Sequence, residues 1–210
     1  MTQEELNTIL DAHEKWSKSC GKEGNQAVFN NEDLSRLSFK GRDLRGIKVK
    51  DCILAYADFS ESDLCFSRFE DTILAHANFD KCDMQVCIFV RCDCTWTNLA
   101  STSLKNSKIE NVTFACGCLT NTDFSSVWLI DTTFVHNNMI GTKFCGAVSD
   151  RTWFVHPIIH NTNFTDMQMR TGTTLCSFQN LTPRSGTIGL DEDTDVSPDD
   201  NDENMIFGGD

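Results

Sequence analysis

Apolar residues recur at every fifth position of this 210-residue chain, from Phe29 to Met169. Of the 29 positions in this series, 28 are apolar, and only Ser149 interrupts it. An amphipathic helix repeats near 3.6 residues and a strand repeats at two, so neither element produces this period. A short repeat that continues over most of a chain is typical of a solenoid. The pattern therefore predicts a stacked, repetitive fold.

A second series of inward positions lies two residues before each apolar centre. Between Cys52 and Thr152, 20 of these 21 positions hold Ala, Cys, Ser, Thr, Val or Gly, and Asn137 is the exception. The other three residues of each unit are mostly polar, as in the unit Ala-Asp-Phe-Ser-Glu at 57–61. Two residues in five are therefore predicted to point inward, one large and one small.

This unit resembles that of the pentapeptide repeat family. The resemblance implies an all-β solenoid, a right-handed quadrilateral β-helix with one unit on each side and about twenty residues per coil. We expect about seven coils, which would span roughly 34 Å at the ~4.8 Å spacing of strands. Residues twenty apart should stack inside the coils. The expected ladders are Phe39, Phe59 and Phe79; Phe114, Phe134 and Phe154; and Phe124, Phe144 and Phe164.

Three parts are expected along the chain: an N-terminal amphipathic capping helix and turn at 1–24, the repeat body at 25–175, and a flexible linker with a disordered acidic tail at 176–210. Thr2 and Glu5 form a capping box at the start of the helix. Its apolar face consists of Leu6, Ile9, Leu10, His13 and Trp16. We expect the helix to cover the exposed end of the first coil.

The net charge of −13 is unevenly distributed, with −4 on residues 29–169 and −7 on residues 170–210. No segment approaches the ~20 apolar residues of a membrane helix, and the first residues do not form a signal peptide. We therefore expect a cytoplasmic protein that does not contact a membrane.

Acidic residues gather on one side of the predicted coil. Four aspartates, interrupted by Ser103, should form a column there: Asp43, Asp63, Asp83 and Asp123. Residues 51–93 hold nine acids and three bases, a net −6, over about 10 Å of axis. Duplex DNA carries about one charge per 1.7 Å, so this segment approaches its charge density. Residues 36–50, by contrast, are basic. The acidic segment predicts a DNA-like surface. The alternative is that outward positions must hold polar residues and that these acids have no role beyond keeping the surface hydrated.

Three tryptophans point outward, Trp96, Trp128 and Trp153, and they are candidate interface anchors, because exposed Trp often has this role. Alternatively, each covers a corner of a coil. The complete set of candidate partner-binding residues is Asp43, Asp58, Asp63, Glu70, Asp71, Asp83, Asp123, Trp128 and Trp153.

The sequence offers no nucleophile–base pair, glycine-rich phosphate loop or paired-histidine metal motif, so we predict no enzymatic activity, cofactor or metal. The spacings Cys92-x-Cys94 and Cys116-x-Cys118 suit zinc. The first pair points inward and the second outward, however, which favours packing. His136 and His156 should be adjacent on the surface, where they could bind a metal or sense pH, or simply be solvated.

A local likeness lies near the end of the repeats. The segments 151–154 and 161–164 resemble the plasmid quinolone-resistance branch of the family, which implies DNA gyrase as a partner. The N-terminal helix is similar to that of phage and bacterial members. The chain departs from that branch because no loop interrupts the phase between Phe29 and Phe144 and because an acidic tail replaces its dimerising helix. The sequence therefore gives no support for a homodimer.

These observations predict a non-enzymatic protein-binding module. We expect a DNA-mimicking inhibitor or modulator of a nucleic-acid-handling protein, which does not itself bind nucleic acid. The partner would be a gyrase-type topoisomerase or, if the protein is phage-encoded, a host or defence protein such as a nuclease. The alternative is a passive structural or adaptor rod that binds a protein through its exposed tryptophans or its C-terminal tail.

Overall fold

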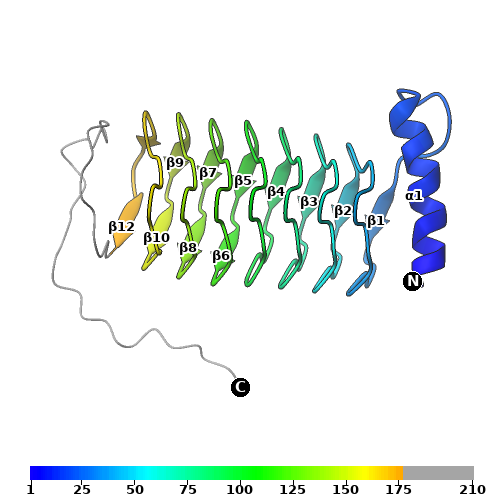
Figure 1. Cartoon of the computed structure of the whole chain (residues 1–210), viewed down its shortest axis with the longest axis horizontal. Helices are drawn as coiled ribbons and strands as arrows, with labels where there is room; N and C mark the ends of the chain where they lie inside the picture. Colours follow the sequence, from blue (N-terminus) through cyan, green and yellow to red (C-terminus); the bar gives the residue numbers. More distant parts are fainter. Residues whose placement is uncertain (177–210) are drawn as a thin grey trace, which may run out of the picture.

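A computed structural model describes residues 1–176 and contains one helix and twelve short strands. Helix α1 (Gln3–Lys18) stands at one end of a column of coils (Figure 1). The strands are β1 (Val28–Asn30), β2 (Lys48–Lys50), β3 (Arg68–Glu70), β4 (Ile88–Val90), β5 (Lys108–Glu110), β6 (Thr113–Ala115), β7 (Trp128–Ile130), β8 (Thr133–Val135), β9 (Val148–Asp150), β10 (Trp153–Val155), β11 (Gln168–Met169) and β12 (Thr174–Cys176).

Strands twenty residues apart pair in parallel and in register, which confirms the predicted β-solenoid of about seven coils. One sheet has the order β1-β2-β3-β4-β5-β7-β9-β11 and the other β12-β10-β8-β6. The two remaining sides are held by single parallel bridges, such as those from Asp58 to Asn78 and from Asp63 to Asp83. Each coil thus has four sides. We name each side after its first apolar centre: the Phe29, Leu34, Phe39 and Leu44 sides.

The interior is filled by stacked rings. Phe59 lies between Phe39 and Phe79 with centroid distances of 4.4 and 4.9 Å, and it meets Phe69 of the opposite side edge-on at 6.2 Å. The two other predicted phenylalanine ladders stack at 4.8–5.3 Å, so all three are confirmed. Small inward residues fill the remaining space. The Cys82 thiol, for example, donates a hydrogen bond to the carbonyl of Phe59.

Each corner of the coil places a residue in the left-handed backbone region. Tyr56, Phe66 and His76 have φ values of 61°, 63° and 59°. This conformation is unfavourable for residues other than glycine, at about 1–2 kcal/mol each. It is held by hydrogen bonds between coils, such as the one from the Tyr56 N–H to the carbonyl of Ala75 at 3.0 Å. The corner side chains consequently project outward.

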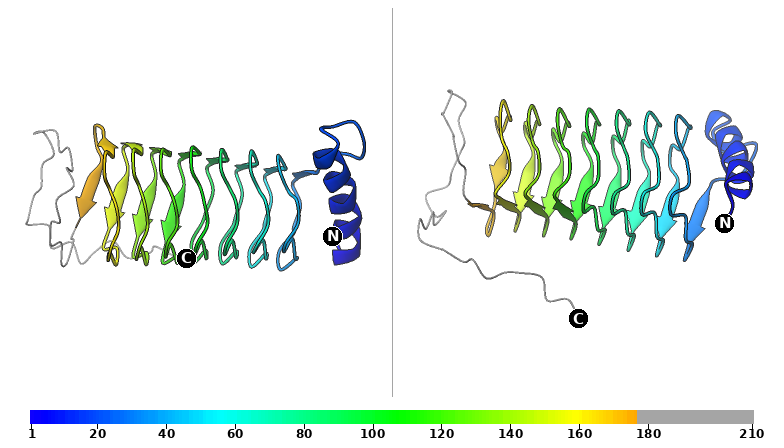
Figure 2. Two further views of the ribbon diagram at one scale, coloured as in Figure 1. Left: turned by 45° about the horizontal axis from the view of Figure 1, so that its top comes forward. Right: turned by 60° about the horizontal axis from the view of Figure 1, so that its bottom comes forward.

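The predicted N-terminal helix is present and carries the expected capping box between Thr2 and Glu5. It lies across the end of the first coil (Figure 2) and buries Leu6, Leu10 and His13 there. The His13 Nδ1 accepts a hydrogen bond from the N–H of Ala27 at 3.0 Å, and burial lowers the pKa of this imidazole. His13 is therefore a packing residue.

The register changes by one residue in the last coil, because Phe154 pairs with Leu175 and not with a residue twenty positions away. Apart from Cys176, the predicted tail at 176–210 lies outside the described residues. Among residues 1–176, no helix is long and apolar enough to cross a membrane.

Candidate protein-interaction surfaces

The predicted acidic column is present on the Leu44 side. Single parallel bridges join Asp43 to Asp63, Asp63 to Asp83, Asp83 to Ser103, and Ser103 to Asp123. Neighbouring members are therefore one strand spacing apart, about 4.8 Å.

The aspartates of this column also have a structural role. The Asp63 carboxylate accepts a hydrogen bond from the N–H of Cys65 at 3.0 Å, and Asp123 accepts one from Ser125 at 2.9 Å. Asp58, on the Phe39 side, accepts the N–H of Ser60 in the same way. An aspartate that bonds the backbone two residues ahead is a common stabiliser of turns. The presence of these acids is thus partly explained by the backbone.

Basic residues neutralise both ends of the column. Arg45 forms two hydrogen bonds with Asp43, at 2.9 and 2.7 Å, and lies 3.5 Å from Asp63. The hydrogen bonds from Arg45 hold the pKa of Asp43 below its usual value. At the other end, Lys105 lies 3.2 Å from Asp123.

Glu70 and Asp71 lie on strand β3 and the corner that follows it, on the adjacent Phe29 side. Arg68 and Arg91 both bond Glu70, and Arg91 also bonds Asp71 at 2.7 Å. Hydrogen bonds from these arginines lower the pKa of both carboxyl groups. The two acids are ionised and paired.

These contacts correct the charge density estimated from residues 51–93 alone. Lys40 and Arg45, which precede that segment, form ion pairs with Glu61 and Asp63 at 3.2 and 3.5 Å. The basic and acidic segments therefore partly neutralise each other across coils. Asp83 has an amide partner, Gln85, and no ion pair with any described residue. Within the column, Asp63 shares Arg45 with Asp43, so the uncompensated charge is centred on Asp83.

Trp128 and Trp153 are exposed, as predicted, but the structure does not bring them together. Trp128 lies on strand β7 of one sheet and Trp153 on β10 of the other. The guanidinium of Arg170 lies 5.4 Å from the centre of the Trp128 ring. Neither tryptophan belongs to the acidic column, so the nine candidate residues do not form one site.

A column of exposed rings, not predicted from the sequence, lies along the corner between the Leu34 and Phe39 sides. Tyr56 and His76 stack at 4.5 Å and 3°, and His76 and Trp96 at 6.1 Å and 2°. The guanidinium of Arg36 covers the free face of Tyr56 at 4.6 Å. The twenty-residue spacing of these residues was the available signal.

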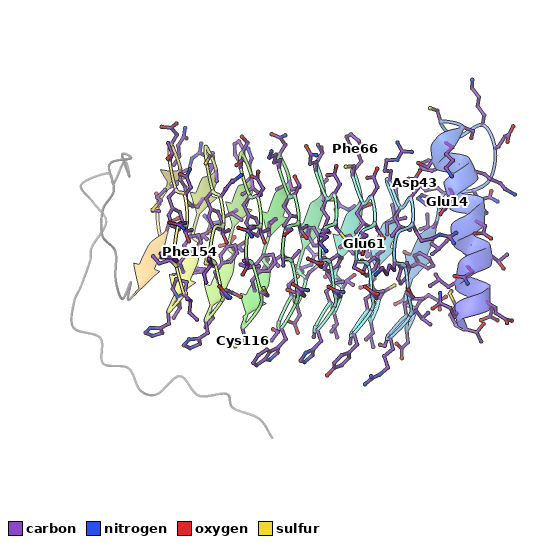
Figure 3. All side chains as sticks on the ribbon, in the orientation of Figure 1. Glu14, Asp43, Glu61, Phe66, Cys116 and Phe154 are labelled. Atoms are coloured by element: carbon purple, nitrogen blue, oxygen red, sulfur yellow. The ribbon has the colours of Figure 1, made fainter. Side chains whose placement is uncertain are left out.

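The same corner continues with Cys116 and then with His136 and His156, whose rings stack at 5.3 Å. Figure 3 shows Cys116 on this edge. Because a thiol replaces a ring at this level, the column is interrupted between Trp96 and His136.

The cysteines are arranged as predicted. Cys92 and Cys94 are buried, and burial raises the pKa of both thiols. Cys116 and Cys118 are half-buried on the outside. No group of three potential metal ligands occurs in the part of the chain that the structure describes.

An apolar notch of about 240 Å³ lies where α1 meets the solenoid. Trp16 and Phe66 form its walls together with Arg45 and two glycines, Gly21 and Gly46. Phe66, at a corner of the coil, is 66% exposed, and the repeat pattern did not single it out.

Comparison with known proteins identifies the repeat. The family model described as pentapeptide repeats matches eight copies at residues 52–85 and 87–125. No curated protein matches the sequence.

Among solved structures, a trypsin-treated variant of QnrB1, a plasmid-mediated fluoroquinolone resistance protein, is 15% identical. It aligns over 72% of this chain and 92% of its own, with a TM-score of 0.58. Full-length QnrB1 is 14% identical, with coverages of 71% and 92% and a TM-score of 0.55. HetL, a pentapeptide repeat protein of the cyanobacterium Nostoc sp. strain PCC 7120, is 14% identical, with coverages of 72% and 91% and a TM-score of 0.39. At these identities, the likeness to QnrB1 concerns the fold.

Proposed function

We propose, from the premise that this chain belongs to the pentapeptide repeat family, that it is a non-enzymatic protein-binding module. Its acidic Leu44 side would occupy the DNA site of a nucleic-acid-handling protein. The observation that carries this proposal is the column of carboxylates at strand spacing, in which Asp83 has no ion pair with any described residue. The filled interior supports binding by the outer wall, because the stacked phenylalanines leave no room for a substrate.

A gyrase-type topoisomerase is the first candidate partner. Two observations support it: the local likeness of residues 151–154 and 161–164 to the quinolone-resistance branch, and the fold shared with QnrB1. A defence nuclease of the host would present a similar basic groove and is the second candidate. Both partners bind a polyanion, so both offer complementary charge to this side of the solenoid.

The test is charge reversal within the column. In pull-down assays from bacterial lysate and titrations with purified gyrase, the double variant D63K/D83K should bind at least about tenfold more weakly than the wild type, since it reverses the charge of two neighbouring carboxylates in the middle of the column. Wild-type binding should also fall steeply as salt is raised.

The matched control is E61K/D80K, which changes the net charge equally but lies on the Phe39 side. This control should keep most of the affinity. The proposal fails if the wild type captures no DNA-binding protein, or if D63K/D83K binds as tightly as the wild type. Equal weakening by both double variants would also contradict it, because net charge and not the column would then decide binding. Circular dichroism should show the same fold for all three proteins.

A further inference from the structure

The Leu34 side of the solenoid differs from the other three in being nearly free of charge. Its outward positions hold mainly small, β-branched or aromatic residues between Ile53 and Val155, and Asp93 is the only carboxylate among them. Ile53 and Ile73 are adjacent and are 42% and 44% exposed. Apolar patches of this kind commonly mark a protein interface.

The distribution of charge indicates which partner the Leu34 side can bind. The chain carries a net −13, so two copies repel each other wherever their charged sides meet. The Leu34 side is where two copies can approach without bringing several carboxylates together. A basic partner, in contrast, would find better complementarity on the acidic Leu44 side. The neutral side therefore fits a second copy of this chain.

The order of large and small side chains matches an antiparallel pair. A twofold axis between the two faces, level with the midpoint of Asp93 and Thr113, would set Ile53 of one copy opposite Trp153 of the other. It would also set Ile73 opposite Thr133. These residues lie in one column at successive strand spacings, so the match follows from their positions in the coil.

The corner column of rings has the same symmetry. The axis would place Tyr56 opposite His156 and His76 opposite His136. Most importantly, it would place Trp96 opposite Cys116, the one small residue between the rings. Trp96 is 56% exposed, and the gap at Cys116 spans two coil steps, about 9.6 Å between the flanking rings. A planar ring held between two others needs about 9 to 14 Å, the sum of two centroid distances of about 4.5 to 7 Å.

We propose that two copies of this protein associate face to face and antiparallel through their Leu34 sides, with Trp96 of each copy in the gap at Cys116 of the other. This inference does not depend on the acidic column or on the identity of its partner. The dimer would leave the Leu44 sides of both copies free.

The mass of the full chain in solution tests association. Sedimentation equilibrium with a reductant present, at concentrations up to about 100 μM, should give twice the chain mass of 23.6 kDa. W96E should be monomeric, because it places a charge in the partner's gap. W128E, at a tryptophan of the Phe29 side that is 48% exposed, should remain dimeric. A monomeric wild type, a dimeric W96E or a monomeric W128E would each overturn the proposal.

An exchange of the two side chains tests the antiparallel geometry. C116W should be monomeric, because it fills the gap that Trp96 of the other copy needs. The double variant W96C/C116W should dimerise again, because a large residue once more faces a small one. Both positions already have positive φ, so the exchange adds no new backbone strain. A double variant that folds by circular dichroism and stays monomeric would refute this arrangement.

Discussion

At the residue scale, one departure from the repeat explains another. Asn137 occupies an inward position that is otherwise small, and Gly117 occupies the same position one coil earlier. The Asn137 Oδ1 accepts the N–H of Gly117 at 2.8 Å, and its Nδ2 donates to the carbonyl of Phe114 at 2.8 Å. A Cβ on residue 117 would lie 3.2 Å from the Asn137 Oδ1 and 2.9 Å from the carbonyl oxygen of Thr97. The large residue therefore depends on the glycine next to it.

Asn137→Ala should lower the free energy of unfolding by about 1–3 kcal/mol, because it leaves a buried N–H and a buried carbonyl without their partner. Urea denaturation measures this change. The control is Ser103→Ala, since the Ser103 hydroxyl has no hydrogen-bond partner among the described residues, and its loss should have little effect. Equal stabilities of Asn137→Ala and the wild type would show that the amide does not contribute.

At the scale of elements, helix α1 is fastened to the solenoid by charge as well as by apolar packing. Arg42 forms ion pairs with Asp11 and Glu14 of the helix. The Asp43 carboxylate accepts a hydrogen bond from the Ser17 hydroxyl at 3.0 Å and is also bonded by Arg45. Asp43 thus belongs to the acidic column and to the attachment of the cap.

Asp43→Asn should destabilise the protein by about 1–2 kcal/mol at pH 7, because the lost hydrogen bonds are to a charged group. The pKa of Asp43 is lowered in the folded state, so its contribution is complete above the unfolded pKa of about 3.9 and is lost as the pH falls through the folded value. The difference from the wild type should therefore shrink in acid. Thermal melts from pH 7 to about pH 2.5 measure it. Asp51→Asn, at an exposed corner, is the control. A difference that persists at the lowest pH would contradict this account.

At the scale of the whole molecule, the coil of twenty residues is the unit that can be removed. Each coil contacts only its neighbours, and its stability is close to the sum of its own terms and those of the two interfaces. The last coil, which has one extra residue before β12, shows that a small deviation is accommodated at the end of the stack.

Deletion of residues 81–100 should therefore preserve the β-sheet spectrum and a cooperative melt, because every later residue keeps its side and its inward or outward direction. Deletion of 81–98 is the control. It removes fewer residues, but it leaves two residues of the twenty-residue coil, and these must bulge out for the later residues to keep their phase. The control should melt at a lower temperature, as measured by circular dichroism. Equal melting temperatures would mean that the phase of the repeat does not limit stability.

The sequence alone determined the period, the inward and outward directions, the capping box and the membership of columns, because each depends only on spacing in a regular coil. The three phenylalanine ladders and the Asp43–Asp63–Asp83 column follow directly from it. The tertiary structure decided which outward groups meet. Arg45 reaches Asp63 from the preceding coil, and Arg91 reaches both Glu70 and Asp71. Such contacts depend on the reach of long side chains between coils, which spacing does not specify. Spacing also places Tyr56, His76 and Trp96 in one column, but the left-handed corners decide that all three side chains project alike and stack.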